Sequence, residues 1–232
     1  MPVPLVLLPG LLCDAALWRP QVEALADVAD CQVADLTRDD SMAAFAERVL
    51  AGAPPRFALA GLSMGGYVAQ EVVRRAPERV MRLALLDTSA RADTEEQSAR
   101  RRGLIELARK GNFKGVTPRL LPLLIHADRL ADEPLTTAVM AMAERVGMAA
   151  FLRQQQAILT RVDGRPDLPR IACPTLVLCG RDDALTPLAV NEEMARLIPG
   201  ARMVVVEACG HLATLERPDA VNAALRDWLG RD

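Results

Sequence analysis

The hexapeptide Gly-Leu-Ser-Met-Gly-Gly at positions 61–66 constrains the fold more than any other part of the chain. The apolar run at 57–60 before it is typical of a buried strand, and residues 67–75 after it have the apolar spacing of a helix. In a sharp turn from a strand into a helix, the positions two before and two after the apex lie very close together. Side chains there must be minimal, which explains Gly61 and Gly65. Ser63, at the apex, then projects its hydroxyl above the sheet from a strained backbone position.

A strand, a tight turn and a helix with serine at the apex form the arrangement called a nucleophile elbow. The unpaired N–H groups in the first turn of the helix point toward whatever reacts with the serine. Glycine-rich turns between a strand and a helix also occur in nucleotide-binding folds, so a plain tight turn is the alternative. The rest of the chain must therefore supply a base and an acid.

Apolar runs alternate with helical stretches along the first 88 residues, which predicts a parallel sheet with right-handed crossovers. The expected strands lie at 3–8, 31–36, 57–62, 80–86, 175–179 and 202–207. The expected helices around them lie at 18–29, 42–51, 64–76, 188–197 and 218–229. We therefore predict an α/β protein with a mostly parallel, doubly wound sheet of about six strands.

Residues 89–166 contain no convincing strand, whereas a crossover between two parallel strands normally needs a single helix. Helices are expected here at 95–110, 116–124, 134–146 and 148–161. We expect this insert to be a small helical lid over the carboxyl edge of the sheet. The core domain would then comprise 1–88 and 167–232, and ordinary layer helices are the alternative.

Composition narrows the class of partner and the compartment. A formal net charge of −2 over 232 residues gives no electrostatic footprint for nucleic acid. The apolar start of the chain has no basic residue before it and is broken by Pro9 and Gly10, which favours a first strand over a signal peptide or membrane span. The 5 cysteines are scattered without metal-ligand spacing, so we expect no metal and mostly buried, reduced thiols in a cytoplasmic protein.

A serine hydroxyl is a weak nucleophile at neutral pH, so it needs a base, and the base needs an orienting carboxylate. The chain has 2 histidines. His211 lies in a loop after the last expected strand, at the edge where open α/β sheets place their sites. His126 lies inside the insert, where a lid or surface imidazole is the simpler interpretation. His211 is therefore the candidate base.

Three aspartates are candidates for the acid. Asp182 and Asp183 lie in the loop after the fifth expected strand, and Asp87 ends the fourth. Exposed aspartates more often cap or turn the chain than take part in catalysis, so position alone does not choose among them. The chain order Ser63, Asp183, His211 does match the Ser, Asp, His order found in one large group of hydrolases.

These motifs together resemble the serine hydrolases of the α/β-hydrolase fold, over essentially the whole chain except the insert. The G-x-S-x-G pattern stands at 61–65, the acid loop G-x-x-D-x-x-x-P at 180–187, and the final G-H and E-x-P at 210–211 and 216–218. The acid loop implies that Asp183, rather than Asp182, orients His211. The H-G of the family is replaced by Pro-Gly at 9–10, and the resemblance implies that the N–H groups of Leu11 and Met64 form the oxyanion hole. Trp18 resembles a loop-packing aromatic of structural importance.

The resemblance implies that Ser63 cleaves a carboxylic ester or lactone through an acyl-enzyme, with no cofactor or metal. The expected partner is a small ester-like molecule, with neither nucleic acid nor membrane. The Leu- and Met-rich insert suggests an apolar acyl or alcohol group, although core packing explains the same residues. Carbon–carbon bond hydrolases, cofactor-free haloperoxidases and a non-catalytic ligand-binding protein are the alternatives. Haloalkane dehalogenases and epoxide hydrolases are disfavoured because they place aspartate where this chain has Ser63.

Overall fold

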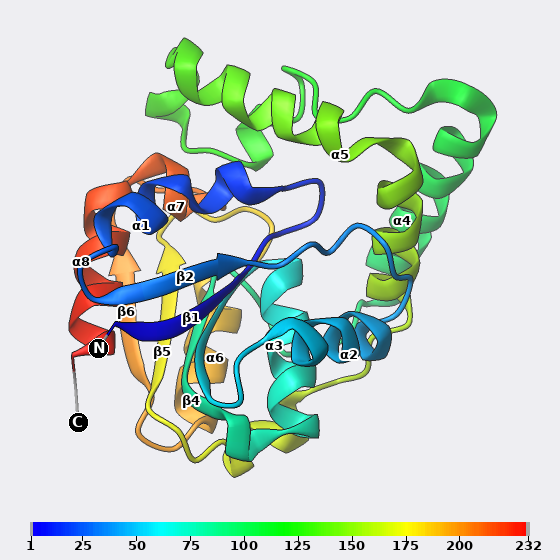
Figure 1. The fold of residues 1–232 in the computed structure, drawn as a ribbon. Helices are drawn as coiled ribbons and strands as arrows, with labels where there is room; N and C mark the ends of the chain where they lie inside the picture. Colours follow the sequence, from blue (N-terminus) through cyan, green and yellow to red (C-terminus); the bar gives the residue numbers. More distant parts are fainter. Residues whose placement is uncertain (1, 231–232) are drawn as a thin grey trace.

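The computed structural model describes residues 2–230 and contains a six-stranded sheet (Figure 1). The strands lie side by side in the order β2-β1-β3-β4-β5-β6, and every neighbouring pair is parallel. Their bounds are β1 (Val3–Leu8), β2 (Ala29–Val33), β3 (Phe57–Leu62), β4 (Val80–Leu86), β5 (Thr175–Gly180) and β6 (Arg202–Val206). The predicted α/β fold with a parallel sheet is confirmed.

Helices cover both faces of the sheet. One face carries α1 (Arg19–Ala24), α7 (Ala213–Glu216) and α8 (Pro218–Leu229), and the other carries α2 (Met42–Gly52), α3 (Met64–Arg75) and α6 (Leu188–Leu197). Leu5 and Leu7 of β1 pack on the first face, and Val6 and Leu8 pack on the second. Because both faces are buried, the strands are continuous apolar runs instead of alternating ones.

The region around β2 differs most from the core expected from the sequence. The expected helix at 18–29 is a 3-10 turn, Ala15–Trp18, followed by the short α1, and the expected strand at 31–36 begins two residues earlier and ends at Val33. Because β2 lies at the edge of the sheet and its residues are mostly half-buried or exposed, hydropathy marks its ends poorly. By contrast, Ser41 caps α2 as expected, accepting a hydrogen bond from the N–H of Ala44.

The insert forms no strand in the described chain, and Figure 1 shows α4 and α5 beside and across the sheet. Its elements are α4 (Glu95–Leu107), a π-helical turn (Ala108–Asn112), two 3-10 turns (Leu121–Leu123 and Ala127–Arg129) and α5 (Glu133–Leu159). The helix expected at 116–124 is wrong, since only one 3-10 turn forms there. Pro118 and Pro122 explain the error, because each proline lacks the N–H that a helix interior needs. Two further 3-10 turns, Pro77–Arg79 and Arg165–Arg170, lead into β4 and toward β5.

Among the described helices, α5 alone is long and apolar enough to cross a membrane, judged by length and composition. Gly147, with φ 73° and ψ 175°, leaves helical geometry and divides α5 in two. This break lies between the two helices that the sequence predicts at 134–146 and 148–161. Each half is shorter than the roughly 20 residues that a membrane-spanning helix requires.

Candidate active site

The turn from β3 into α3 holds Ser63 at the carboxyl edge of the sheet. Ser63 has φ 55° and ψ −117°, a conformation that is strained for any residue with a side chain. The N–H of Ser63 donates to the carbonyl oxygen of Leu86 at 3.0 Å. The hydroxyl of Thr88 donates to the carbonyl oxygen of Ser63 at 2.7 Å. Both partners follow or end β4, so the neighbouring strand stabilises the strained turn.

Glycine is required at both crowded positions of this turn. A Cβ atom on Gly61 would lie 2.3 Å from the carbonyl oxygen of Gly65, and one on Gly65 would lie 2.1 Å from that of Leu8. Neither contact can be relieved by a side-chain rotation, because both involve backbone. The crowding expected from the sequence is therefore present, and it brings β1, β3 and α3 together at Ser63.

The imidazole of His211 lies between Ser63 and Asp183. The Nε2 atom of His211 is 2.8 Å from the Oγ atom of Ser63, and its Nδ1 atom is 2.9 Å from Oδ2 and 3.0 Å from Oδ1 of Asp183. The His211 and Asp183 residues are only 3% and 4% exposed. Three loops that are distant in sequence thus bring these three predicted residues into direct contact.

Asp183 is held as an ionised acceptor. Burial acts to raise its pKa, but attraction to His211 and hydrogen bonds from His211 and Thr186 outweigh burial and lower the pKa to about 2. The hydroxyl of Thr186 donates to Oδ2 at 2.6 Å, and the N–H groups of Leu185 and Thr186 donate to Oδ1. A carboxylate on Nδ1 keeps a proton on that nitrogen, which leaves Nε2 to accept one from Ser63.

The neighbouring Asp182 turns away from this arrangement. Its carboxylate lies 3.5 Å from Nε2 of His126, whose Nδ1 contacts Asp128 at 2.8 Å. The side chain of Asp182 is half exposed, whereas that of Asp183 is buried. The structure therefore places Asp183 beside His211, and His126 beside the carboxylates of Asp182 and Asp128 in a partly exposed cluster.

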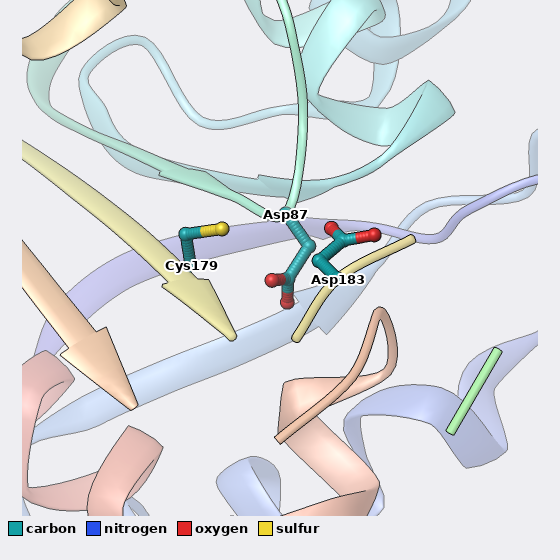
Figure 2. A group of neighbouring side chains, drawn as sticks. All are labelled: Asp87, Cys179 and Asp183. Atoms are coloured by element: carbon teal, nitrogen blue, oxygen red, sulfur yellow. The ribbon is translucent and has the colours of Figure 1, made fainter. Parts of the chain in front are cut away.

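A second buried carboxyl group, Asp87, lies behind Asp183. Figure 2 shows its side chain between those of Cys179 and Asp183, and one ligand atom from each of these residues lies within 4.8 Å of the others. Burial and the charge of Asp183 raise the pKa of Asp87 well above its usual range, and burial also raises that of the Cys179 thiol. Burial therefore favours the protonated form of both groups next to the ionised Asp183.

Asp87 also supports the loop that carries Asp183. Its Oδ1 atom accepts the N–H of Gly180 at 2.7 Å, at the end of β5. Asp87 itself has φ 43°, which is strained for a non-glycine residue. The sequence suggests Asp87 only as a candidate acid, and its support of Gly180 depends on a contact between residues 93 positions apart.

Glu216 joins the histidine loop to the insert. Its carboxylate accepts the N–H groups of His126 at 2.6 Å, of Gly210 at 3.1 Å and of Leu212 at 3.1 Å. Burial raises its pKa, although these three hydrogen bonds oppose the shift. The carbonyl oxygen of Leu124 in turn accepts the N–H of His211. Hydrogen bonds from both the histidine loop and the insert therefore hold the backbone around His211.

The two expected oxyanion donors, Leu11 and Met64, lie beside Ser63. A Cβ atom on Gly10, just before Leu11, would be 3.4 Å from Cβ of Ser63, and Met64 begins α3. Neither Leu11 nor Met64 donates its N–H to another group among residues 2–230. The buried Gln154 of α5, which the sequence does not single out, accepts the N–H of Leu12 at 3.1 Å and holds this loop.

A cavity of about 480 Å³ lies between Ser63 and the insert. Its wall on the side of the sheet includes Leu11, Leu62, Ser63 and His211. Its wall on the side of the insert is largely apolar and includes Leu104, Leu107, Phe113, Leu120, Leu124, Val139, Phe151 and Ile158. Ser63 is half-buried, so its hydroxyl can meet a molecule in this cavity.

Proteins similar to this chain in sequence and in structure are named as hydrolases. The chain is 29% identical to a pimeloyl-[acyl-carrier protein] methyl ester esterase of Nitrosomonas europaea, over 93% of this chain and 91% of that protein. Its structure is similar to a thermophilic esterase of Thermogutta terrifontis (TM-score 0.89, 31% identity, 98% of this chain and 89% of that chain). It is also similar to the enol-lactonase of Burkholderia xenovorans (TM-score 0.90, 27% identity, 100% of this chain and 92% of that chain).

A profile of the alpha/beta hydrolase family matches residues 5–224, which is nearly the whole chain. The parallel six-stranded sheet and its flanking helices are the architecture of that fold. By this match, and with relatives named as esterase and enol-lactonase, the chain belongs to the alpha/beta hydrolase family and is a hydrolase.

Proposed function

We propose that this protein hydrolyses a carboxylic ester or lactone through an acyl-enzyme formed on Ser63. One observation carries the proposal: Nε2 of His211 lies 2.8 Å from Oγ of Ser63 while Asp183 holds the opposite ring nitrogen. This is the spacing that proton transfer from a serine nucleophile requires. The relatives named as esterase and enol-lactonase support the same class of substrate.

In the first half of the reaction, His211 accepts the proton of Ser63 while Oγ attacks the carbonyl carbon. The negative charge then develops on the carbonyl oxygen, where the N–H groups of Leu11 and Met64 would donate to it. Loss of one such donor typically removes about 3–4 kcal/mol of transition-state stabilisation. As the tetrahedral intermediate collapses, His211 gives its proton to the departing alcohol oxygen.

In the second half, His211 accepts a proton from water, and the hydroxide oxygen attacks the acyl carbon. Collapse of this second intermediate breaks the bond to Oγ, returns the proton to Ser63 and releases the carboxylic acid. The ionised Asp183 stabilises the imidazolium that forms in both halves. Every proton in these steps moves among Ser63, His211, the substrate and water.

We also propose that the insert at 89–166 acts as a cap over a core domain made of 1–88 and 167–232. The supporting observation is the cavity, which has sheet loops on one wall and insert residues on the other. A cytoplasmic location, and a small-molecule partner without nucleic acid or membrane, stay predictions from the sequence.

Replacement of Ser63 by alanine tests the proposal. The kcat for p-nitrophenyl butyrate should fall by about 10⁴-fold or more, because only binding and the oxyanion donors remain. The melting temperature should stay near that of the wild type, since the hydroxyl is not part of the core. A fluorophosphonate probe should label the wild type at Ser63 and leave Ser63→Ala unlabelled. Retained turnover in the variant would place the nucleophile elsewhere.

Carbon–carbon bond hydrolases, cofactor-free haloperoxidases and non-catalytic binding proteins remain the alternatives on this fold. A screen of esters of increasing acyl length, lactones, thioesters and vinylogous diketones, with Ser63→Ala as control, separates the hydrolytic alternatives, and halogenation with bromide and hydrogen peroxide tests the haloperoxidase. Turnover confined to diketones would favour carbon–carbon cleavage. Failure of the probe to label Ser63 would favour a binding protein.

A further inference from the structure

We propose that the substrate carries a carboxylate at the end remote from the reacting carbonyl, and that Arg100 and Lys114 recognise it. We call these two residues the anion site. The inference rests on the proposed function and names its substrate class, a monoester of a dicarboxylic acid or a lactone acid. Both side chains line the cavity and are exposed, so they lie where the cavity opens to solvent.

The charged side chains that line the cavity are all positive. Its ionic side chains are those of Arg100, Arg101 and Lys114, and no aspartate or glutamate among residues 2–230 lines it. The chain as a whole has a net charge of −2, so this surplus of cations is local. A cavity wall with one sign of charge attracts and orients a ligand of the opposite sign.

Ion pairing inside the insert neutralises Arg101 only in part. The Nε atom of Arg101 is 2.6 Å from Asp93, and the same carboxylate lies 2.8 Å from Arg161, whose guanidinium lies over the ring of Tyr67. Asp93 is thus one buried carboxylate shared by two guanidinium groups. Arg101 also donates to Oε1 of Gln155 at 2.9 Å, which leaves the Gln155 side chain only its N–H₂ donors for the cavity.

The two cations of the anion site have no acidic partner among the described residues. Arg100 and Lys114 take part in none of the ion pairs that link other basic residues of the insert to carboxylates. The acidic residues of α4, which are Glu95, Glu96 and Glu106, do not line the cavity. Helix α4 therefore places its acids outside the cavity and turns two arginines toward it.

Apolar side chains line the same cavity as the anion site and Ser63. Leu104, Leu107 and Phe113 line the cavity from the same segment as the two cations, while Ser63 and His211 line it from loops of the sheet. A chain of methylene groups suits the apolar wall, and a terminal carboxylate suits the cations. Hydrolysis then adds water across the ester bond alone, giving the dicarboxylate and the free alcohol while the remote carboxylate is unchanged.

The test compares monomethyl adipate with the neutral methyl hexanoate, using methanol release to obtain kcat/KM. Exposed cations contribute modestly, so the wild type should prefer the anionic ester by about tenfold at low salt. The double variant Arg100→Gln/Lys114→Gln should lose about tenfold of that preference, mainly through KM. Sodium chloride at 0.5 M should reduce the preference of the wild type.

The matched control is Arg102→Gln/Lys110→Gln. Both residues are exposed, belong to the same segment and do not line the cavity, so this variant should keep the wild-type preference. Equal kcat/KM values for the two esters in the wild type would overturn the inference. The same loss in both double variants would overturn it too. A preference that needs the acyl chain to be attached to an acidic carrier protein would assign the cations to protein docking instead.

Binding to Ser63→Ala separates this inference from the proposed function. Calorimetry should show tighter binding of intact monomethyl adipate than of methyl hexanoate to this variant, and the difference should disappear when Arg100→Gln/Lys114→Gln is added. Preferential binding without any turnover by the wild type would keep the anion site and overturn ester hydrolysis. Turnover of both esters without a preference would do the reverse.

Discussion

The sheet core and the insert differ in how completely they bury their apolar side chains. Strands β3 and β5 are buried at every position. Among the described residues, the large hydrophobic side chains that remain exposed are Leu104, Leu107, Leu120, Leu130, Met148, Val162 and Leu185. All except Leu185 belong to the insert, and Leu185 itself lines the cavity.

This contrast separates two tasks. In the core, dense packing fixes the backbone of the strands and of the loops that follow them. This fixed backbone keeps Ser63, His211 and Asp183 in contact. The insert leaves apolar surface uncovered, and part of that surface faces the cavity where a ligand would bind. Changes in the core should therefore alter the reaction or the stability, and changes in the insert should alter the choice of substrate.

The largest expected effect is on kcat, and it distinguishes two adjacent aspartates. Asp183 contacts His211 of the core, and Asp182 contacts His126 of the insert. Asp183→Asn should lower kcat for p-nitrophenyl butyrate by about 10⁴-fold, because an amide on Nδ1 favours the wrong tautomer of His211. Asp182→Asn, which removes only a half-exposed contact with His126, should change kcat by less than about threefold. Similar losses in the two variants would contradict the assignment of the acid.

The next effect compares two glycines. Gly61→Ala should destabilise the protein by about 3 kcal/mol or more in urea unfolding, since its Cβ would meet backbone at 2.3 Å. In Gly103→Ala, within α4, the Cβ would meet nothing within 4 Å, and stability should rise by up to about 1 kcal/mol. If the urea midpoint of unfolding of Gly61→Ala equals that of the wild type, the turn is less crowded than described.

A third comparison uses two leucines. Leu59→Ala, at a position with 0% exposure in β3, should cost about 2–5 kcal/mol of unfolding free energy. Leu107→Ala, at 53% exposure on the cavity, should cost less than about 0.5 kcal/mol and instead shift the preferred acyl length in an ester series. An unchanged length profile would show that Leu107 does not contact the substrate.

The smallest effect, counted for each pH unit, concerns Asp87, whose raised pKa favours the protonated form. Its pKa is raised on folding, so its contribution to stability is complete below about pH 4, its unfolded pKa, and is lost as pH rises toward the folded pKa. Asparagine does not titrate and still offers an oxygen to Gly180. The stability of Asp87→Asn relative to the wild type should therefore increase from pH 5 to pH 9, by at most about 1.4 kcal/mol per pH unit. A constant difference would mean that Asp87 is ionised in the folded protein.

Local patterns in the sequence were sufficient to predict most of the core, Ser63 as the candidate nucleophile and His211 as the candidate base, whereas the choice of Asp183 depended on the resemblance to a known family. Each local pattern is a short signal, such as a buried apolar run or the glycines of the turn, with a direct steric or chemical cause. The parallel order of the strands then brings the loops after β3, β5 and β6 to one edge.

Sequence patterns failed where long-range contacts decide the structure. Nothing near Asp87 or Glu216 indicates that their carboxylates would accept backbone N–H groups of Gly180 and His126. In the insert, the count of apolar residues does not reveal which of them face a cavity. The helix wrongly expected at 116–124 shows that two prolines outweigh apolar spacing when little tertiary packing supports the helix.

The carboxylate of Glu216 has a consequence for engineered chimaeras. It accepts hydrogen bonds from His126 on one side and from both neighbours of His211 on the other. An insert grafted from another hydrolase must therefore place a backbone N–H where that of His126 lies, or Glu216 loses one of its three donors beside His211. Swaps that exchange α4 alone leave this junction untouched, so α4 is the simpler part of the insert to replace.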